Sequence, residues 1–352
     1  MALRTDIYSN QKELSEREKD ILRTIIHMYI LNASPIGSRT LSKYLEHELK
    51  LSPATIRNIM SDLEEMDYIS HPHTSAGRIP TDKGYRYYVD TLMHNEHLSE
   101  HEIRTLKGNL SAITPDNVLR DASKLLGMLS KCLGIVAIPH FTDMIIQKIE
   151  LISLSSNRIL VVLALDSKIV RTVTLEAEFE ISISELEKIT SFINDRVSGK
   201  SLKFVEDNFQ AMINDGEFSK APLIRLFIES IDKLFENYQT GDRIHIAGTQ
   251  HLLEYPEFDD VQRVKSVIEL VENEDVIIHV LDKIETEVSE PKIFIGSEMH
   301  NQILDDYSLI VTTYRMGKAE GSIGLIGPKR MNYSRLTSLV QYVGELISYK
   351  QK

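Results

Sequence analysis

Residues 51–80 read LSPATIRNIMSDLEEMDYISHPHTSAGRIP, a stretch that combines a helical pattern with two short extended segments. Ser52 precedes Pro53, and a serine N-cap followed by proline in the first helical position is a strong signal for the start of a helix. The helical pattern continues to about Met66. Extended segments at 68–70 and 78–80 then flank a glycine-containing turn, which predicts a β-hairpin.

The flanking sequence supplies the remaining parts of a winged helix-turn-helix. Ser15-Glu16-Arg17-Glu18 is a capping box, and apolar residues recur at helical spacing through 16–31, which predicts an amphipathic helix. A shorter helix is predicted at 38–47, and another begins at 81–82, after the hairpin. Three helices, a hairpin and a further helix in this order indicate a DNA-binding winged helix over residues 1–90.

The helix that follows Ser52 has one apolar face and one face of short polar side chains with a single arginine. A solvated surface helix more often carries Glu, Lys and Gln. Hydroxyl, amide and guanidinium groups instead suit hydrogen bonding to base edges in the major groove. An ordinary surface helix remains the alternative interpretation of this pattern.

These patterns assign DNA-binding roles to ten residues. The residues expected to read bases are Thr55, Arg57 and Asn58, and Ser61 lies on the same face. The residues expected to contact the DNA backbone and so position the protein on it are Ser38, Arg39, Ser52 and Arg78. His73 and Ser75 lie at the tip of the β-hairpin, which is the wing of the motif.

The net charge of −12 for 352 residues is unfavourable for a protein that coats DNA, so its distribution matters. Residues 1–90 contain 12 Lys and Arg against 13 Asp and Glu, whereas the remainder contains 28 against 39. Salt screens charges beyond about 8 Å at physiological ionic strength. The acidic excess therefore argues against loose nucleic-acid binding but permits a small reading domain.

Composition excludes several other classes of protein. The content of 42% hydrophobic and 26% charged residues is that of a soluble globular protein, and no apolar stretch approaches the roughly 20 residues that a membrane span needs. The N-terminus lacks the apolar segment of a signal peptide, and the single cysteine, Cys132, excludes an intramolecular disulfide framework. We therefore expect a cytoplasmic protein with no membrane partner.

No pattern indicates an enzyme, a cofactor or a metal site. The chain lacks GxSxG, GxxxxGK[ST] and HExxH, and Cys132 lies in the apolar run KCLGIVAI, which is typical of a buried cysteine. His94, His97 and His101 would share one face of a connecting helix over 91–108 and could hold a metal. A solvated linker face is the favoured interpretation, so no metal ligand is predicted.

The sequence after residue 108 predicts a sheet interrupted by a second unit. A helix at 116–131 leads into a strand at 134–138, and strands at 147–154, 159–165 and 169–176 then form an antiparallel meander. Predicted helices follow at 184–197, 202–213 and 222–238. Strands resume at 243–247, 292–295, 308–313 and 321–326, with helices at 259–273, 298–305 and 333–349.

Several segments resemble the heat-inducible transcription repressor family HrcA. They are LSEREKDILRTIIHMYI, SPIGSRTLSK, LSPATIRNIMSDLEEMDYI and HTSAGRIPTDKGYRYYVD in the first 92 residues, and LLGMLSKCLGIV and GSIGLIGPKRMNYSRL beyond them. The resemblance implies a repressor of chaperone and chaperonin operons that binds an inverted-repeat operator and is released on heat stress. It also implies a chaperonin partner and a GAF-like domain that carries an inserted dimerisation domain.

The resulting expectation is an α+β multidomain protein: a winged helix at 1–90, a connecting helix at 91–108, a GAF-like α/β domain at 109–142 and 241–352, and an inserted dimerisation domain of a three-stranded antiparallel sheet with helices at 143–240. One winged helix reads only a few base pairs, so a homodimer on a two-fold axis is expected to bind the double-stranded operator. The alternative function is a small-molecule-responsive regulator with an effector in the GAF-like pocket. Heat could act through intrinsic unfolding or through loss of chaperonin.

Overall fold

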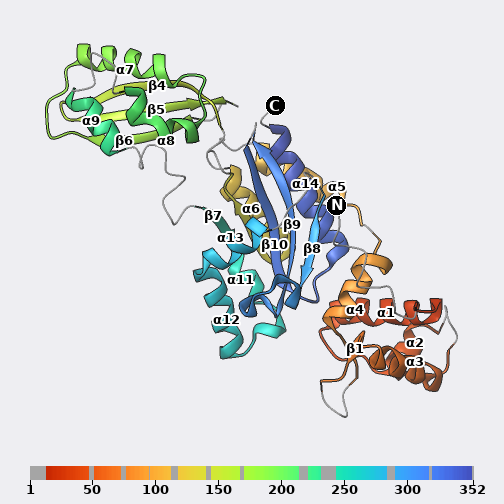
Figure 1. The fold of residues 1–352 in the computed structure, drawn as a ribbon. Coiled ribbons are helices and arrows are strands. Elements are labelled where there is room, and N and C mark those ends of the chain that lie inside the picture. The colour runs from red at the N-terminus through yellow and green to blue at the C-terminus, as the bar shows by residue number, and fades with distance from the viewer. Residues whose placement is uncertain are drawn as a thin grey trace.

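The computed structural model describes residues 13–46, 51–72, 77–94, 96–111, 118–139, 144–166, 170–213, 221–230, 243–283, 290–316 and 319–350. They form three regions that follow one another in space: a winged helix, a central unit around a five-stranded sheet, and a unit around a three-stranded sheet (Figure 1). His73 and Ser75, predicted at the tip of the wing, lie outside the described residues.

The winged helix has the order of elements that the sequence predicts. Its elements are α1 (Glu16–Asn32), α2 (Ser38–Tyr44), α3 (Pro53–Glu65), β1 (Ile69–Ser70), β2 (Ile79–Pro80) and α4 (Asp82–Tyr87). The predicted capping box is present, since the backbone N–H of Ser15 donates to Glu18 and that of Glu18 donates to the Ser15 hydroxyl. β1 and β2 pair antiparallel, and a bridge between Ile36 and Arg78 joins the wing to the segment before α2.

The connection after the winged helix differs from the prediction of one continuous helix over 91–108, which is wrong. A single π-helical turn ends at Leu92, the described residues 93–94 and 96–99 are not helical, and a new helix, α5 (Glu100–Ser111), begins after them. Ser99 and Glu102 explain the new start, because the Ser99 backbone N–H donates to the Glu102 carboxylate at 2.8 Å and the Glu102 backbone N–H donates to the Ser99 hydroxyl at 3.3 Å. His94 and His97 therefore precede α5 and do not share a helix face with His101.

The central sheet has the strand order β7-β3-β10-β9-β8, with antiparallel pairing throughout. Its strands are β3 (Leu133–Ala137), β7 (Ile244–Ala247), β8 (Lys292–Ile295), β9 (Tyr307–Met316) and β10 (Ala319–Pro328). Helices α6 (Val118–Ser130) and α14 (Tyr333–Lys350) pack on one face, and α11 (Thr249–Leu252), α12 (Val261–Glu272) and α13 (Glu274–Lys283) lie on the other (Figure 1). Each face therefore has its own hydrophobic core.

The third unit lies in sequence between β3 and β7, which pair with each other in the central sheet. Its sheet has the order β4-β5-β6, with β4 (Ile146–Ser155), β5 (Arg158–Leu165) and β6 (Val170–Glu176). Helices α7 (Ile183–Val197), α8 (Leu202–Ile213) and α9 (Pro222–Glu229) follow, and their apolar residues form one core with the sheet. The three predicted strands and the antiparallel meander are confirmed. We call this region the inserted unit.

One other prediction is wrong, and one observed helix has no counterpart among the predicted ones. The helix expected at 298–305 is two short 3₁₀ turns, Gly296–Met299 and Gln302–Leu304, because His300 adopts a left-handed conformation with φ of 50° between them. The helix α13 was not predicted, although Asn273 ends α12 immediately before it. Within the described part of the chain, no helix is both long enough and apolar enough to cross a membrane.

Candidate nucleic-acid interface

Helix α3 presents a polar face to solvent and an apolar face to the core of the winged helix. Ile56, Met60 and Leu63 are buried on its inner side. The predicted base-reading residues lie on the other side, where the exposed side chains are Thr55, Arg57, Asn58, Ser61 and Asp62. The structure therefore brings the predicted reading residues together on one accessible helix face.

The start of α3 is fixed by its own side chains. The Ser52 hydroxyl accepts a hydrogen bond from the backbone N–H of Thr55 at 3.1 Å and lies 2.9 Å from the Thr55 hydroxyl. The side chains of Arg57 and Asn58, by contrast, make no hydrogen bond or ion pair with the residues that the structure describes. A guanidinium and an amide that are free in this way can both make bidentate contacts with bases.

Helix α2 supports α3 and carries two further predicted contacts. Leu41 is fully buried and anchors α2, whereas Ser38 is half-buried at its first position and Arg39 is exposed beside it. In a helix-turn-helix the first helix of the motif crosses the DNA backbone, so residues at this end of α2 are placed to contact phosphate. The assignment of Ser38 and Arg39 to the DNA backbone stays a prediction.

Arg78 on the wing has a protein partner that sequence reasoning missed. Its Nε donates to the Glu64 carboxylate at 2.8 Å, and its Nη2 lies 2.7 Å from the same oxygen. Burial raises the pKa of Glu64, but hydrogen bonds from His71 and Arg78 lower it below its ordinary value, so Glu64 is ionised at neutral pH. Arg78 therefore ties the wing to the end of α3, and a phosphate would have to share its guanidinium with Glu64. No local pattern marks this pair, because 14 residues separate the two side chains.

The described residues contain no cluster of three or more His, Cys, Asp or Glu side chains arranged to hold a metal ion. Cys132 is fully buried, as its apolar neighbours predict. Burial raises the pKa of its thiol to about 12, although hydrogen bonds with Tyr255 and Ser130 act to lower it. The thiol is therefore protonated at neutral pH and is not a nucleophile.

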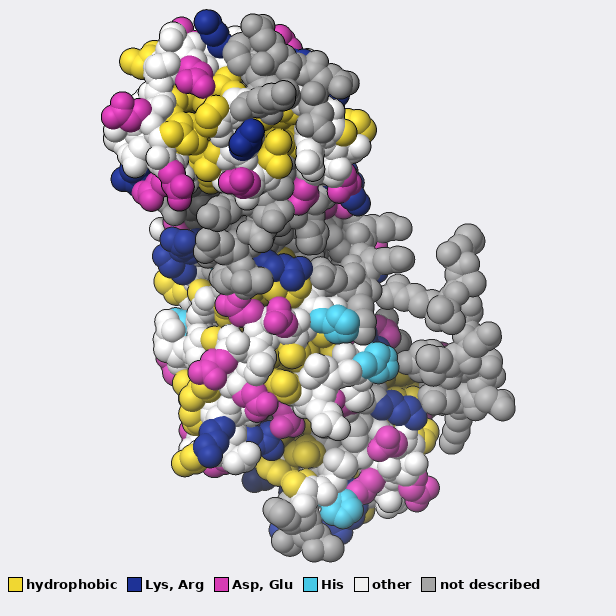
Figure 2. All heavy atoms as spheres, turned by 60° about the vertical axis from the view of Figure 1, so that its left-hand side comes forward, with side chains coloured by type: hydrophobic (Ala, Val, Ile, Leu, Met, Phe, Trp, Pro, Cys, Tyr) yellow, Lys and Arg dark blue, Asp and Glu magenta, His cyan; other side chains and the backbone are white. Residues whose placement is uncertain are grey.

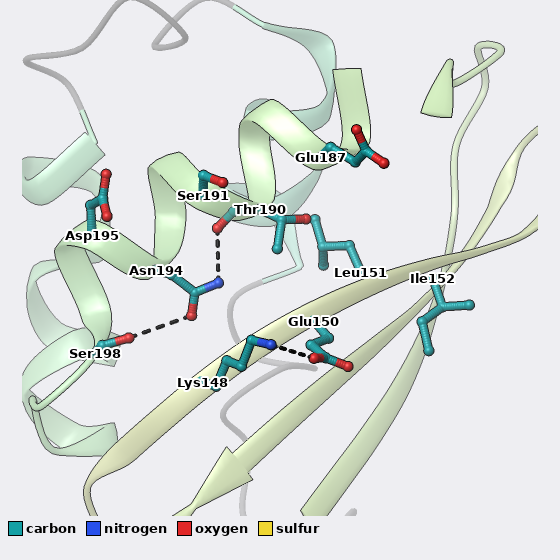
Figure 3. A pocket seen from close by; sticks show the side chains of 10 residues that line it. All are labelled: Lys148, Glu150, Leu151, Ile152, Glu187, Thr190, Ser191, Asn194, Asp195 and Ser198. Atoms are coloured by element: carbon teal, nitrogen blue, oxygen red, sulfur yellow. Dashed lines mark hydrogen bonds and ion pairs between the residues drawn. The ribbon is translucent and has the colours of Figure 1, made fainter. Parts of the chain in front are cut away.

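A polar hollow of about 560 Å³ lies in the inserted unit between β4 and α7 (Figure 3). Asn194 of α7 closes part of the exposed edge of β4, because its side chain accepts from the Ile149 N–H at 2.8 Å and donates to the Ile149 carbonyl at 2.7 Å. An amide in this position replaces the hydrogen bonds of a neighbouring strand. Lys148 and Glu150 form an ion pair at its rim. The hollow thus contains a structural contact of the sheet edge.

Comparison with known proteins gives two matches that together cover most of the chain. A family described as "Winged helix-turn-helix transcription repressor, HrcA DNA-binding" matches residues 13–92, and one described as "HrcA protein C terminal domain" matches residues 116–337. The chain belongs to the HrcA family. HrcA proteins named heat-inducible transcription repressors are similar to it over nearly their whole length: that of Chlorobium phaeobacteroides strain BS1 is 36% identical over 348 residues, covering 96% of this chain and 98% of the relative.

A second HrcA relative, from Prosthecochloris aestuarii, is 35% identical and covers 96% of this chain and 97% of its own. A solved structure described as a hypothetical protein at 2.2 Å resolution shares the fold, with a TM-score of 0.64, 24% identity and coverage of 97% of this chain and 100% of its own. The resemblance to HrcA read from the sequence is therefore confirmed. This HrcA family member is a heat-inducible transcription repressor with an N-terminal DNA-binding winged helix.

Proposed function

We propose that this repressor binds an inverted-repeat operator as a homodimer, with α3 of each subunit in the major groove, and that the operons it controls encode chaperones and chaperonins. The observation that carries the proposal is the exposed polar face of α3, on which Arg57 and Asn58 have no partner among the described residues. The base-edge assignment goes to Thr55, Arg57, Asn58 and Ser61, and the backbone assignment to Ser38, Arg39, Ser52 and Arg78.

The proposed dimer axis passes through the inserted unit. One face of its sheet packs on α7 to α9, and the other face carries Leu160, Val162 and Ala164 of β5. In the register, Leu160 is paired with Ile152 of β4 and Ala164 with Val170 of β6, so these five apolar residues share the outer face, together with Lys148 and Glu150, which are paired with Ala164 and Val162. Ile152 and Val170 are 45% and 53% exposed.

A sheet face with a cluster of apolar residues beside an ion pair suits pairing with a second copy of itself about a two-fold axis. Figure 2 shows a side of the inserted unit on which hydrophobic side chains gather between charged ones. We accordingly propose that residues 143–240 form the dimerisation domain, and we propose that the central unit at 109–142 and 241–352 is a GAF-like domain. A dimer places two winged helices on one duplex, which matches an inverted repeat.

Heating could release the repressor from the operator by either of two routes. Heat could depopulate the DNA-competent dimer directly, because marginal stability makes the folded fraction steeply temperature-dependent. A chaperonin could instead maintain the folded repressor and be drawn away by damaged proteins during heat stress. A melting curve of the purified dimer, with and without chaperonin and ATP, separates these routes.

The direct test is a titration of the full-length protein into a labelled inverted-repeat duplex, with a duplex of the same length whose half-sites are scrambled as the control. At equal salt, we expect a preference of about a thousandfold or more and two subunits per duplex. Equal weak binding to both duplexes, unchanged by chaperonin and ATP, would contradict the proposed operator.

A further inference from the structure

Helix α4 joins the winged helix to the central unit through a buried contact. Tyr85 of α4 is 2% exposed, and its ring lies 5.9 Å from that of Tyr333 at the start of α14. The Tyr333 hydroxyl lies 2.8 Å from the Ser308 hydroxyl in β9, so the contact extends into the sheet. The winged helix and this face of the central sheet also share one continuous hydrophobic core.

Two ion pairs flank this contact. Arg86 of α4 donates from Nε to the Glu298 carboxylate at 2.8 Å, and its Nη2 donates to the Ile293 carbonyl at 2.7 Å. Asp82, at the first position of α4, pairs with Lys329 at 2.6 Å. The side chains of Arg86 and Lys329 are 21% and 27% exposed and those of their carboxylate partners are both 32% exposed, so both pairs are partly shielded from solvent.

Gly296 makes room for the Asp82 pair. Its φ of 52° lies in the left-handed region that favours glycine. A Cβ at this position would lie 2.2 Å from an Asp82 carboxylate oxygen and 2.7 Å from Lys329 Nζ. The loop between β8 and β9 therefore leaves room for these two charges to meet.

A third attachment holds the far end of α1. Arg330, only 9% exposed, pairs with Glu257 of the central unit and donates from Nη1 to the carbonyl of Ile30 at 3.0 Å. Ile30 lies in the last turn of α1. The winged helix is thus held at α1 and at α4, and two attachment points on different helices restrict its rotation as well as its separation.

We infer that two ion pairs, Asp82–Lys329 and Arg86–Glu298, position the winged helix for operator recognition. By fixing each winged helix on its central unit, they fix the separation of the two α3 helices in the dimer. That separation selects the spacing between operator half-sites. This inference rests on the proposed dimer. A freely jointed winged helix would follow its half-site when the spacing changes. A fixed one would not, because each added base pair moves a half-site by about 3.4 Å and rotates it by about 35°.

The test measures the affinity of the full-length dimer for duplexes whose half-sites stand at the natural spacing or are moved apart by one, two or five base pairs, and for a duplex with one half-site. For the unmodified protein we expect affinity to fall at least tenfold by two added base pairs. The double variant Glu298→Gln, Lys329→Gln should bind the single half-site as before but lose part of this spacing dependence, because Arg330 and the buried Tyr85 contact still hold the winged helix. The single variant Lys329→Arg keeps the positive charge at this position. It should show the same spacing dependence as the unmodified protein.

A matched control removes an ion pair elsewhere. Glu100 and Arg104 of α5 pair at 3.1 Å while 90% and 77% exposed, so Glu100→Gln with Arg104→Gln should leave the spacing profile unchanged. A flat profile in the unmodified protein that still prefers the cognate half-site overturns the inference without touching the proposed function. A profile in the double variant that is as steep as that of the unmodified protein also overturns it. Absence of any preference for the cognate half-site contradicts the proposed function itself.

Discussion

Replacement of Glu257 by alanine gives a quantitative test of how the winged helix is attached. Arg330 is 9% exposed and Glu257 is 27% exposed, and their two polar contacts include an Nη2–Oε2 distance of 3.0 Å. Loss of one partner of a buried ion pair costs about 3–5 kcal/mol because the remaining charge stays buried. Arg330 would keep the Ile30 carbonyl and the ring of Tyr255, whose centroid lies 5.0 Å from the guanidinium carbon. We therefore expect the lower end, about 3 kcal/mol.

The assay is urea unfolding followed by far-UV circular dichroism, since the chain has no tryptophan to report by fluorescence. Glu257→Gln keeps an acceptor for the guanidinium and should lose less free energy of unfolding than Glu257→Ala. Glu100→Ala removes one partner of an exposed pair and should change the free energy by about 0.5 kcal/mol or less. A Glu257→Ala variant as stable as Glu100→Ala would refute the claim that Arg330 needs its partner.

Three further predictions concern the DNA interface and acid stability. Asn58→Ala should cost about 1–3 kcal/mol on the cognate site and lower the ratio of cognate to scrambled affinity in a binding titration; an unchanged ratio would remove Asn58 from the reading face. Arg78→Ala should weaken binding to all duplexes alike and reduce the steepness of log affinity against log salt by about one. Glu64→Gln, which frees Arg78 for phosphate, should increase the affinity for all duplexes and the steepness of this salt dependence. A loss of affinity in Arg78→Ala that depends on the DNA sequence would contradict the phosphate assignment. Burial raises the pKa of Glu102, but hydrogen bonds from Ser99 and Arg335 lower it to about 2, so the ionised carboxylate stabilises the fold above pH 4.5 and this stabilisation is lost as the pH falls toward 2. The difference in urea midpoint between the unmodified protein and Glu102→Gln should therefore shrink as the pH falls over that range. A constant difference would argue against the lowered pKa.

The winged helix could be predicted because its signals are local. The Ser15 capping box, the Ser52-Pro53 helix start and the apolar spacing within α3 each act over a few residues, and all three appear in the structure as predicted. The meander of the inserted unit was readable for the same reason, since short turns separate its strands. The continuous helix over 91–108 was wrong because the helix start at Ser99 interrupts it.

Contacts between distant segments could not be predicted from these signals. Arg86 and Glu298 are 212 residues apart in sequence, and Asp82 and Lys329 are 247 residues apart. Each of these side chains alone resembles an ordinary surface charge. Two of the segments that resemble HrcA, one around α4 and one around the start of α14, nevertheless meet at this contact, which only the folded chain shows.

The central claim, that α3 lies against the operator in both subunits, can be tested with a tethered cleavage reagent. Cys132 is the only cysteine and is fully buried, so a cysteine introduced at an exposed site can be labelled selectively with an iron chelate. Glu65→Cys places the chelate at the exposed end of α3, outside the residues assigned to DNA contacts, and Ser191→Cys places it on α7 of the inserted unit as the control. We expect Glu65→Cys to cut the operator in two clusters, one in each half-site, and Ser191→Cys to leave the DNA intact. Uniform cutting from Glu65→Cys, or equal cutting from both positions, would contradict the placement of α3 on the operator.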